Sequence, residues 1–161
     1  MTPAQIIVTY FVSNLVAITF FFITLKWNHL ARALYAALFL WAAWLNWSVS
    51  HTNPTFYLNY SKYAVGMYRD FINGPFSNNI TLIVSVIAIC QLMIGLGQFA
   101  GGVIFKMSCI GGIIFLVAIS PLGALAAFPS GLIWSAGLLN LYKSPFNKNI
   151  FSTQFTRKVA L

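Results

Sequence analysis

The chain has 161 residues, of which 60% are hydrophobic and only 6% are charged. A soluble domain carries roughly 25% charged residues because its surface faces water, so this composition excludes an ordinary soluble domain and indicates one membrane domain. Nine Lys and Arg residues against a single acid give a net charge of +8. The basic residues are dispersed between apolar runs, which excludes the dense basic patch of a nucleic-acid-binding protein and indicates charges that set membrane topology.

Two charge-free stretches, 1–25 and 33–61, open the chain and predict its first helices, over about 4–25 and about 31–50. Each can supply the roughly 20 apolar residues that a membrane crossing needs. The first stretch lacks a basic start and a small-x-small cleavage site, so we expect a retained helix rather than a signal peptide. Asn53-Pro54 ends the second helix, since proline disfavours helical geometry in the residue before it.

The next segment has a different pattern, with aromatic and polar residues on opposite sides at helical spacing. This pattern predicts an amphipathic helix over about 55–72 that lies on the membrane surface. Lys62 and Arg69 fall on its polar side, and we expect both to lie at the lipid interface, where Arg69 anchors a lipid phosphate. Asn73-Gly74-Pro75 ends the segment.

A third crossing is predicted over about 79–104, before a long apolar run that occupies 107–142. One helix of that length would measure about 54 Å, whereas the hydrocarbon core is about 30 Å thick. The run must therefore fold back, and Pro121 and Pro129 lie near its middle. Two shorter helices and a basic cytoplasmic tail are predicted, over about 107–126, 129–143 and 144–161. The predicted fold is thus an all-α transmembrane helical bundle.

Five crossings would place the two ends of the chain on opposite sides of the membrane. Seven basic residues then fall on the side of the C-terminus and two on the other. By the positive-inside rule this predicts an outer N-terminus and a cytoplasmic C-terminus, whereas four crossings give six against three and fit the rule less well. The seven residues are Lys26, Arg32, Lys106, Lys143, Lys148, Arg157 and Lys158.

Several loose motifs between about residues 30 and 143 carry a resemblance. They are Arg32 at the start of an aromatic helix, Asn53-Pro54, Tyr68-Arg69-Asp70-Phe71-Ile72, Gln91 with Gly95, Pro121-Leu122-Gly123 and Phe128-Pro129. In these the chain resembles the DoxX-like family of small bacterial membrane proteins. The resemblance implies a four-helix membrane bundle in the inner membrane, with the first predicted helix as an addition. Some relatives are linked to sulfur oxidation, quinone reduction or redox stress, so quinone is the one cofactor it suggests, and it implies no catalytic residues.

No Asp, Glu, Lys or Arg falls in the middle of a predicted helix. This argues against a charge-based proton relay, a voltage sensor and an ion-coupled transporter. Neutral residues are the candidates for a ligand site: Asn46 and Gln91 for a polar head group, Trp41 and Trp44 for stacking on a planar ligand, and His51 near a quinone head. The alternative is that the amides only join helices and that the tryptophans serve packing or an interfacial belt.

Glycines are expected to bring the third and fourth predicted helices together. Gly97 and Gly101 have the GxxxG spacing, and Gly111 and Gly112 follow in the next helix. Small residues let two helix backbones approach closely, and homodimerisation through the same face is the alternative. The two cysteines match no metal-ligand spacing and no CxxC motif, so we predict free thiols and no metal site.

Three classes of function stay open on the sequence. The first is a DoxX-like membrane component, non-catalytic or associated with quinone and redox chemistry. The second is a structural or assembly subunit of a membrane complex, and the third is a transporter or channel for a neutral or apolar solute. The expected partners are the lipid bilayer, a membrane redox protein and a further copy of the chain, and an enzyme is not the favoured interpretation.

Overall fold

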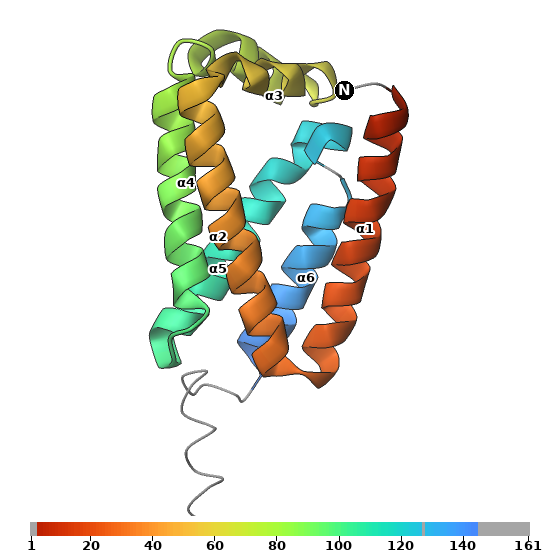
Figure 1. Ribbon diagram of the computed structural model, residues 1–161, viewed down its shortest axis with the longest axis vertical. Coiled ribbons are helices and arrows are strands. Elements are labelled where there is room, and N and C mark those ends of the chain that lie inside the picture. Colours follow the sequence, from red (N-terminus) through yellow and green to blue (C-terminus); the bar gives the residue numbers. More distant parts are fainter. Residues whose placement is uncertain (1–2, 127, 145–161) are drawn as a thin grey trace, which may run out of the picture.

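The protein is described by a computed structural model that covers residues 3–126 and 128–144. The described residues form helices and connecting turns, which confirms the all-α prediction. Five helices pack side by side along one axis, and short helices cover one end of them (Figure 1). Four of these helices are long and apolar enough to cross a membrane.

The first two helices form an antiparallel pair with a single residue, Trp27, between them. α1 comprises Pro3–Lys26 and α2 comprises Asn28–Thr52. Their bounds differ from the predicted ones by at most three residues at each end. Both are continuous because neither contains a glycine, and the proline of α1 occupies its first position, where proline is tolerated.

The amphipathic segment is not the single helix predicted over 55–72. The chain breaks at Val65, whose backbone is extended (φ −61°, ψ 155°) and whose N–H donates to the carbonyl oxygen of Pro121 at 3.1 Å. A residue whose N–H pairs with a distant segment cannot continue the helical ladder. The pieces are the 3₁₀ helix η1 (Pro54–Lys62), α3 (Gly66–Phe71) and the π-type helix η2 (Ile72–Phe76). We call residues 54–76 the cap layer.

The third helix was predicted to end at about 104 and the fourth to begin at about 107, and in the structure both boundaries lie earlier in the chain. α4 comprises Ile80–Gly97 and α5 comprises Gly102–Ile119. Lys106, used as the boundary between two apolar runs, lies inside α5 with its Nζ 5.5 Å from the centre of the Tyr142 ring. A lysine can sit within a membrane helix near its end because its long stem carries the ammonium towards water.

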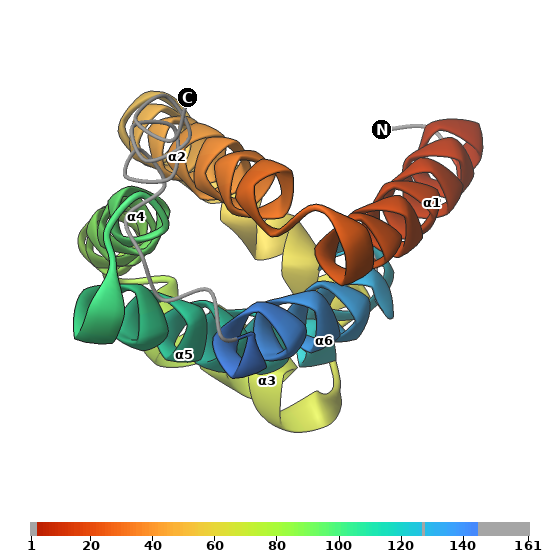
Figure 2. The same cartoon turned by 90° about the horizontal axis from the view of Figure 1, so that it is seen from below.

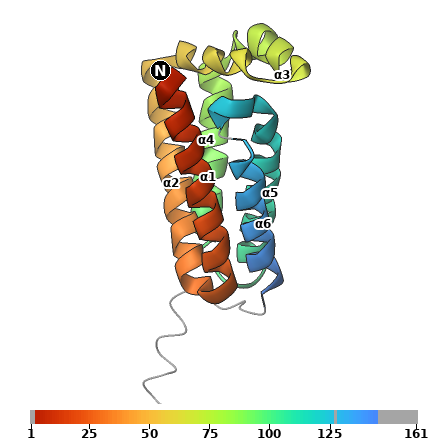
Figure 3. The ribbon, with the colours of Figure 1, turned by 90° about the vertical axis from the view of Figure 1, so that its right-hand side faces the viewer.

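The predicted fold-back occurs at η3 (Ser120–Ala126), after which α6 (Ser130–Lys143) returns beside α5. Gly123 turns the chain with φ +76°, a conformation that favours glycine. A Cβ there would also collide with the carbonyl oxygen of Tyr63. The cap layer thus lies directly on this turn (Figure 3).

The helices are arranged in the order α2, α4, α5, α6, α1 around the bundle (Figure 2). α1 runs parallel to α6 and diverges from α2 above their shared turn. The main core is filled by large, almost completely buried side chains, namely Tyr35, Phe39, Phe105, Leu138 and Leu141. A second cluster lies under the cap layer and contains Tyr57, Ile72, Phe76, Ile80 and Val84.

The charged side chains of the described residues divide between the two ends of the bundle. One end, which we call the basic end, holds the α1–α2 turn, the α4–α5 turn and the end of α6. It carries Lys26, Arg32, Lys106 and Lys143, whereas the cap layer carries Lys62, Arg69 and the acid Asp70. The remaining predicted members, Lys148, Arg157 and Lys158, lie outside the described residues.

Candidate functional site

Two of the residues predicted to line a ligand site are hydrogen-bonded to each other. The Asn46 Nδ2 group on α2 donates to Gln91 Oε1 on α4 at 2.8 Å. The hydroxyl of Tyr57, from η1, donates to Asn46 Oδ1 at 2.9 Å. We call these three residues the amide cluster. Gln91 is 3% exposed and Tyr57 is 9% exposed, so the cluster joins two long apolar helices and the cap layer inside the protein.

A close approach of α2 and α4 lets these short side chains meet. Gly95 lies one helical turn after Gln91, and a Cβ at this position would stand 2.9 Å from Leu40 Cγ. Thr81 adds a second tie at the cap-layer end of the same interface, where its hydroxyl donates to the Ser50 carbonyl oxygen at 3.0 Å. The amide cluster is therefore part of a tightly packed helix pair.

The amide cluster is chemically neutral. Burial, with a smaller contribution from the neighbouring Tyr60, raises the pKa of Tyr57 to about 12. Its hydroxyl therefore stays protonated at any ordinary pH and acts as a hydrogen-bond donor. The two amides use a donor and an acceptor on each other, as expected for polar groups that join helices in an apolar medium.

The aromatic residues predicted for the same site lie on the outside of the protein. Trp41 and Trp44 are 60% and 66% exposed. His51 is also exposed, with its Nδ1 atom 2.7 Å from the Trp47 carbonyl oxygen and its ring 4.7 Å from the Trp47 ring. We call these four residues the aromatic stripe. Of the five predicted ligand residues, the structure brings only Asn46 and Gln91 into contact with each other.

A buried arginine at the opposite end of α2 was missed as a site residue. Arg32 is 1% exposed, and its guanidinium donates to the backbone oxygen of Gln98 from Nε at 2.9 Å and from Nη2 at 2.7 Å. Nη2 also donates to the backbone oxygen of Ala100. The guanidinium carbon lies 3.9 Å from the centre of the Phe105 ring. We call these four residues the arginine cluster.

The end of α4 explains how an arginine can be buried here without a carboxylate. The last carbonyl groups of a helix have no partner within the helix, and they form the negative end of its dipole. Arg32 donates to the carbonyl oxygen of Gln98, the C-cap residue of α4, and to that of Ala100 in the turn after it. The Phe105 ring adds a cation–π contact. The sequence placed Arg32 at the start of the predicted helix and gave no signal of its burial, whereas in the structure α2 begins at Asn28 and Arg32 lies one turn inside it.

The side chain of Gln98 extends the arginine cluster towards α5. Its Nε2 group donates to Ser108 Oγ at 2.5 Å, and that hydroxyl donates to the Ile94 carbonyl oxygen at 2.7 Å. The α4–α5 turn is thereby held from both sides, by α2 through Arg32 and by α5 through Ser108. The cluster acts as a structural clamp.

The two residues predicted for the lipid interface lie exposed in the cap layer. Lys62 Nζ donates to Asn59 Oδ1 at 3.1 Å, and Arg69 Nε donates to the Ser61 carbonyl oxygen at 3.2 Å. These contacts hold both side chains along the cap layer without burying their charges. Their position at the lipid interface and the contact of Arg69 with a lipid phosphate stay predictions.

The four glycines predicted for helix packing do not share one helix face. Gly97 ends α4, and Gly101 precedes the first residue of α5, so the GxxxG spacing spans a helix end and a turn. Gly97 does bring α4 against α5, since a Cβ there would stand 2.6 Å from Ser108 Cβ. A Cβ at Gly111 or Gly112 would contact a side chain of α4.

Cys90 is exposed, Cys109 is buried, and both are free thiols. Within residues 3–126 and 128–144, no group of three or more His, Cys, Asp or Glu side chains gathers that could hold a metal ion. The amide cluster and the arginine cluster thus join α2 and α4 at two different levels of the described bundle. No known protein family matches the chain, and neither a curated protein nor a solved structure does.

Proposed function

We propose that the chain is an integral protein of a bacterial cytoplasmic membrane, in which α1, α2, α4, α5 and α6 cross the bilayer. The outward distribution of apolar side chains carries this proposal. Phe11, Leu15, Leu82 and Met107, on three different helices, are 65–67% exposed. Soluble proteins rarely expose apolar patches that extend over several helices, whereas in lipid such surfaces carry no penalty.

The fifth crossing needs separate support because α6 has 14 residues. Such a helix is about 21 Å long, less than the roughly 30 Å of the hydrocarbon core. The turn before it is covered by the cap layer, through the Val65–Pro121 bond of 3.1 Å and a bond of 2.8 Å from the Tyr68 hydroxyl to the Ala118 oxygen. Irregular backbone is tolerated at membrane depth where protein covers it.

Membrane fractionation tests this location. We expect the chain to stay in the membrane pellet after an alkaline carbonate wash and to enter the supernatant only with detergent. Recovery of a folded protein in the detergent-free supernatant would contradict it. A peripheral protein of similar charge serves as the control and should be released by carbonate.

The basic end supports a cytoplasmic C-terminus, because basic residues accumulate on the cytoplasmic side of membrane proteins. Fusions to the last residue, Leu161, test this orientation. We expect a green fluorescent protein placed there to fluoresce and alkaline phosphatase to be inactive. The reverse pair of results would assign the basic end to the outside.

The role that we propose is that of a non-catalytic membrane component of the DoxX-like kind. Its support is chemical: the amide cluster is neutral and internally paired, and the guanidinium of Arg32 is engaged by backbone carbonyls. A pore for a neutral solute would need polar side chains along its wall, and Asn46 and Gln91 are the predicted ligand residues that could line it. Because they bond to each other, the transporter alternative has less support than the other two.

Quinone binding is the second candidate, favoured by the aromatic stripe. Its exposed rings face the medium in which quinones dissolve, and flat rings stack favourably with one another. Titration of the detergent-solubilised protein with a short-chain benzoquinone tests this role. We expect tryptophan quenching that saturates and that is lost in Trp41→Leu/Trp44→Leu but kept in Trp27→Leu. Identical quenching in Trp41→Leu/Trp44→Leu and in Trp27→Leu would contradict quinone binding at the aromatic stripe. The assembly-subunit alternative would then be left, and it requires that a stable partner is recovered in mild-detergent pull-downs.

A further inference from the structure

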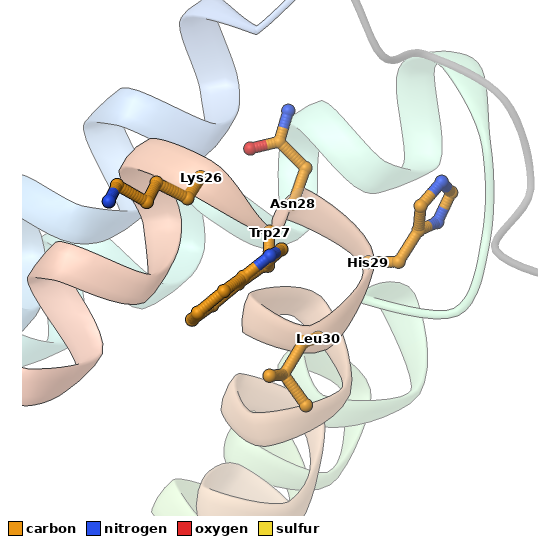
Figure 4. A pocket seen from close by; sticks show the side chains of 5 residues that line it. All are labelled: Lys26, Trp27, Asn28, His29 and Leu30. Carbon is orange, nitrogen blue, oxygen red and sulfur yellow. The ribbon is translucent and has the colours of Figure 1, made fainter.

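A groove of about 540 Å³ lies at the α1–α2 turn (Figure 4). Its volume is within the usual range of small-ligand sites. Consecutive residues line it, and they combine a cation, two polar side chains and two apolar ones: Lys26, Trp27, Asn28, His29 and Leu30. The groove takes no part in the amide cluster, the arginine cluster or the aromatic stripe.

The position of the groove along the bundle places it at the level of lipid headgroups. It joins two candidate spans, one that ends at Lys26 and one that begins at Asn28. The ends of spanning helices lie where hydrocarbon gives way to headgroups. The groove is also at the basic end, which the proposed orientation assigns to the cytoplasmic leaflet.

The electrostatics of the groove favour an anion. Lys26 is exposed at the end of α1, and the bond of 2.6 Å from Asn28 Nδ2 to Ser144 Oγ brings the end of α6, with Lys143, beside the groove. The one acid of the chain, Asp70, is in the cap layer at the opposite end. The groove contains the first residues of α2, at the positive end of that helix dipole, and the last residue of α1, at the negative end of the α1 dipole. The two dipole ends offset each other, so the positive charge of the groove comes from Lys26 and Lys143.

The apolar members of the groove favour a lipid over a small ion. Trp27 is 60% exposed and Leu30 is 47% exposed. A tryptophan at this depth packs beside the glycerol and upper acyl region of a phospholipid. A free phosphate would use only the cationic side of the groove, whereas a phospholipid also covers these two side chains.

We propose that this groove binds one anionic phospholipid, with its phosphate beside Lys26 and the start of α2 and its acyl chains along Trp27 and Leu30. The proposal rests on the membrane location argued above and adds a specific lipid site to it. The proposed phospholipid stays bound to the protein in detergent, unlike the lipids of the surrounding bilayer.

Native mass spectrometry of the detergent-solubilised full chain tests the site. The protein is incubated with equal amounts of phosphatidylglycerol and phosphatidylcholine, and the wild type is compared with Lys26→Gln, Lys26→Arg and the control Lys62→Gln at the opposite end. We expect the wild type to retain phosphatidylglycerol about five-fold more than phosphatidylcholine. The preference should disappear in Lys26→Gln and persist in Lys26→Arg and Lys62→Gln.

Three results would overturn the proposal. They are equal retention of the two lipids by the wild type, an equal loss in Lys26→Gln and Lys62→Gln, or displacement of the lipid by inorganic phosphate at the same concentration. The last result would assign the site to a free anion. Should Lys26→Gln fail to fold, high salt replaces it: the wild-type preference must then fall, because salt screens exposed charges. None of these results bears on the carbonate wash, so the two proposals fail separately.

Discussion

The amide cluster and the arginine cluster join the same two helices, α2 and α4, in different ways. Nearer the cap layer, neutral side chains of α2, α4 and η1 bond to one another across the interface. At the basic end, one charged side chain bonds to backbone oxygens. The difference shows where an apolar helical bundle can bury a charge. A suitable place is beside the C-terminal end of a helix, because the unpaired carbonyl groups and the negative end of the helix dipole attract a cation.

The largest expected effect comes from Arg32. In Arg32→Met the carbonyl groups of Gln98 and Ala100 lose their donors while remaining covered, so we expect the free energy of unfolding to fall by about 3 kcal/mol. Arg32→Lys should recover only part of this, because an ammonium lacks the planar fork of donors. Unfolding in mixed micelles with rising dodecyl sulfate measures both values. The exposed Arg69→Met is the control, and equal effects at the two positions would refute the clamp.

A smaller loss is expected when the α4–α5 contact at the arginine cluster is overpacked. In Gly97→Ala the new Cβ would stand 2.6 Å from Ser108 Cβ, and overpacking costs about 2 kcal/mol. Gly66→Ala is the matched control, since nothing lies within 4 Å of a Cβ there. The same unfolding assay checks the difference. Equal stabilities of Gly97→Ala and Gly66→Ala would show that α4 and α5 can move apart at this contact without a loss of stability.

The amide cluster should contribute less than the arginine cluster. Its members are neutral, and hydrogen bonds between helices in membranes average about 0.6 kcal/mol. A double-mutant cycle with Asn46→Ala and Gln91→Ala isolates the bond between them. We expect a coupling energy of about 1 kcal/mol or less. Strictly additive effects would mean that the 2.8 Å contact has no energetic role.

The last effect concerns Tyr57, is absent at neutral pH and appears only as a dependence on alkaline pH. Because burial raises its pKa from 10.0 to about 12, the folded chain keeps a proton that the unfolded chain loses between these values. This contribution to stability is therefore complete below about pH 10 and lost as the pH rises towards 12. Unfolding curves across this range should fall less steeply in Tyr57→Phe than in the wild type. Parallel curves would contradict the assigned burial.

Charge spacing made most of the bundle predictable from the sequence. A helix in hydrocarbon must be free of charge over roughly 20 residues, so uncharged runs marked α1 and α2. The same rule misplaced the α4–α5 turn because Lys106 lies inside α5, one turn after its start, where a long side chain can carry its charge past the helix end. The amphipathic pattern of residues 55–72 identified the cap layer but could not show its break, which depends on the distant Pro121.

The candidate sites were only partly predictable, for a related reason. Asn46 and Gln91 were identifiable as polar residues in apolar helices, but their partners depend on how closely α2 approaches α4 at Gly95. Arg32 looked like one more topology-setting charge near a helix end. Its burial follows from the carbonyls of Gln98 and Ala100, and a linear pattern does not place these beside it.

One measurement tests directly whether the outward apolar surface meets lipid or water. Cys90 lies near the middle of α4 and is exposed from the protein, so a nitroxide attached to it in a Cys109→Ser background reports on the surrounding medium. After reconstitution into vesicles, we expect its relaxation to be strongly enhanced by oxygen, which concentrates in hydrocarbon, and hardly at all by a water-soluble nickel chelate. Strong enhancement by the nickel chelate and weak enhancement by oxygen would show that α4 faces water and would contradict the membrane bundle.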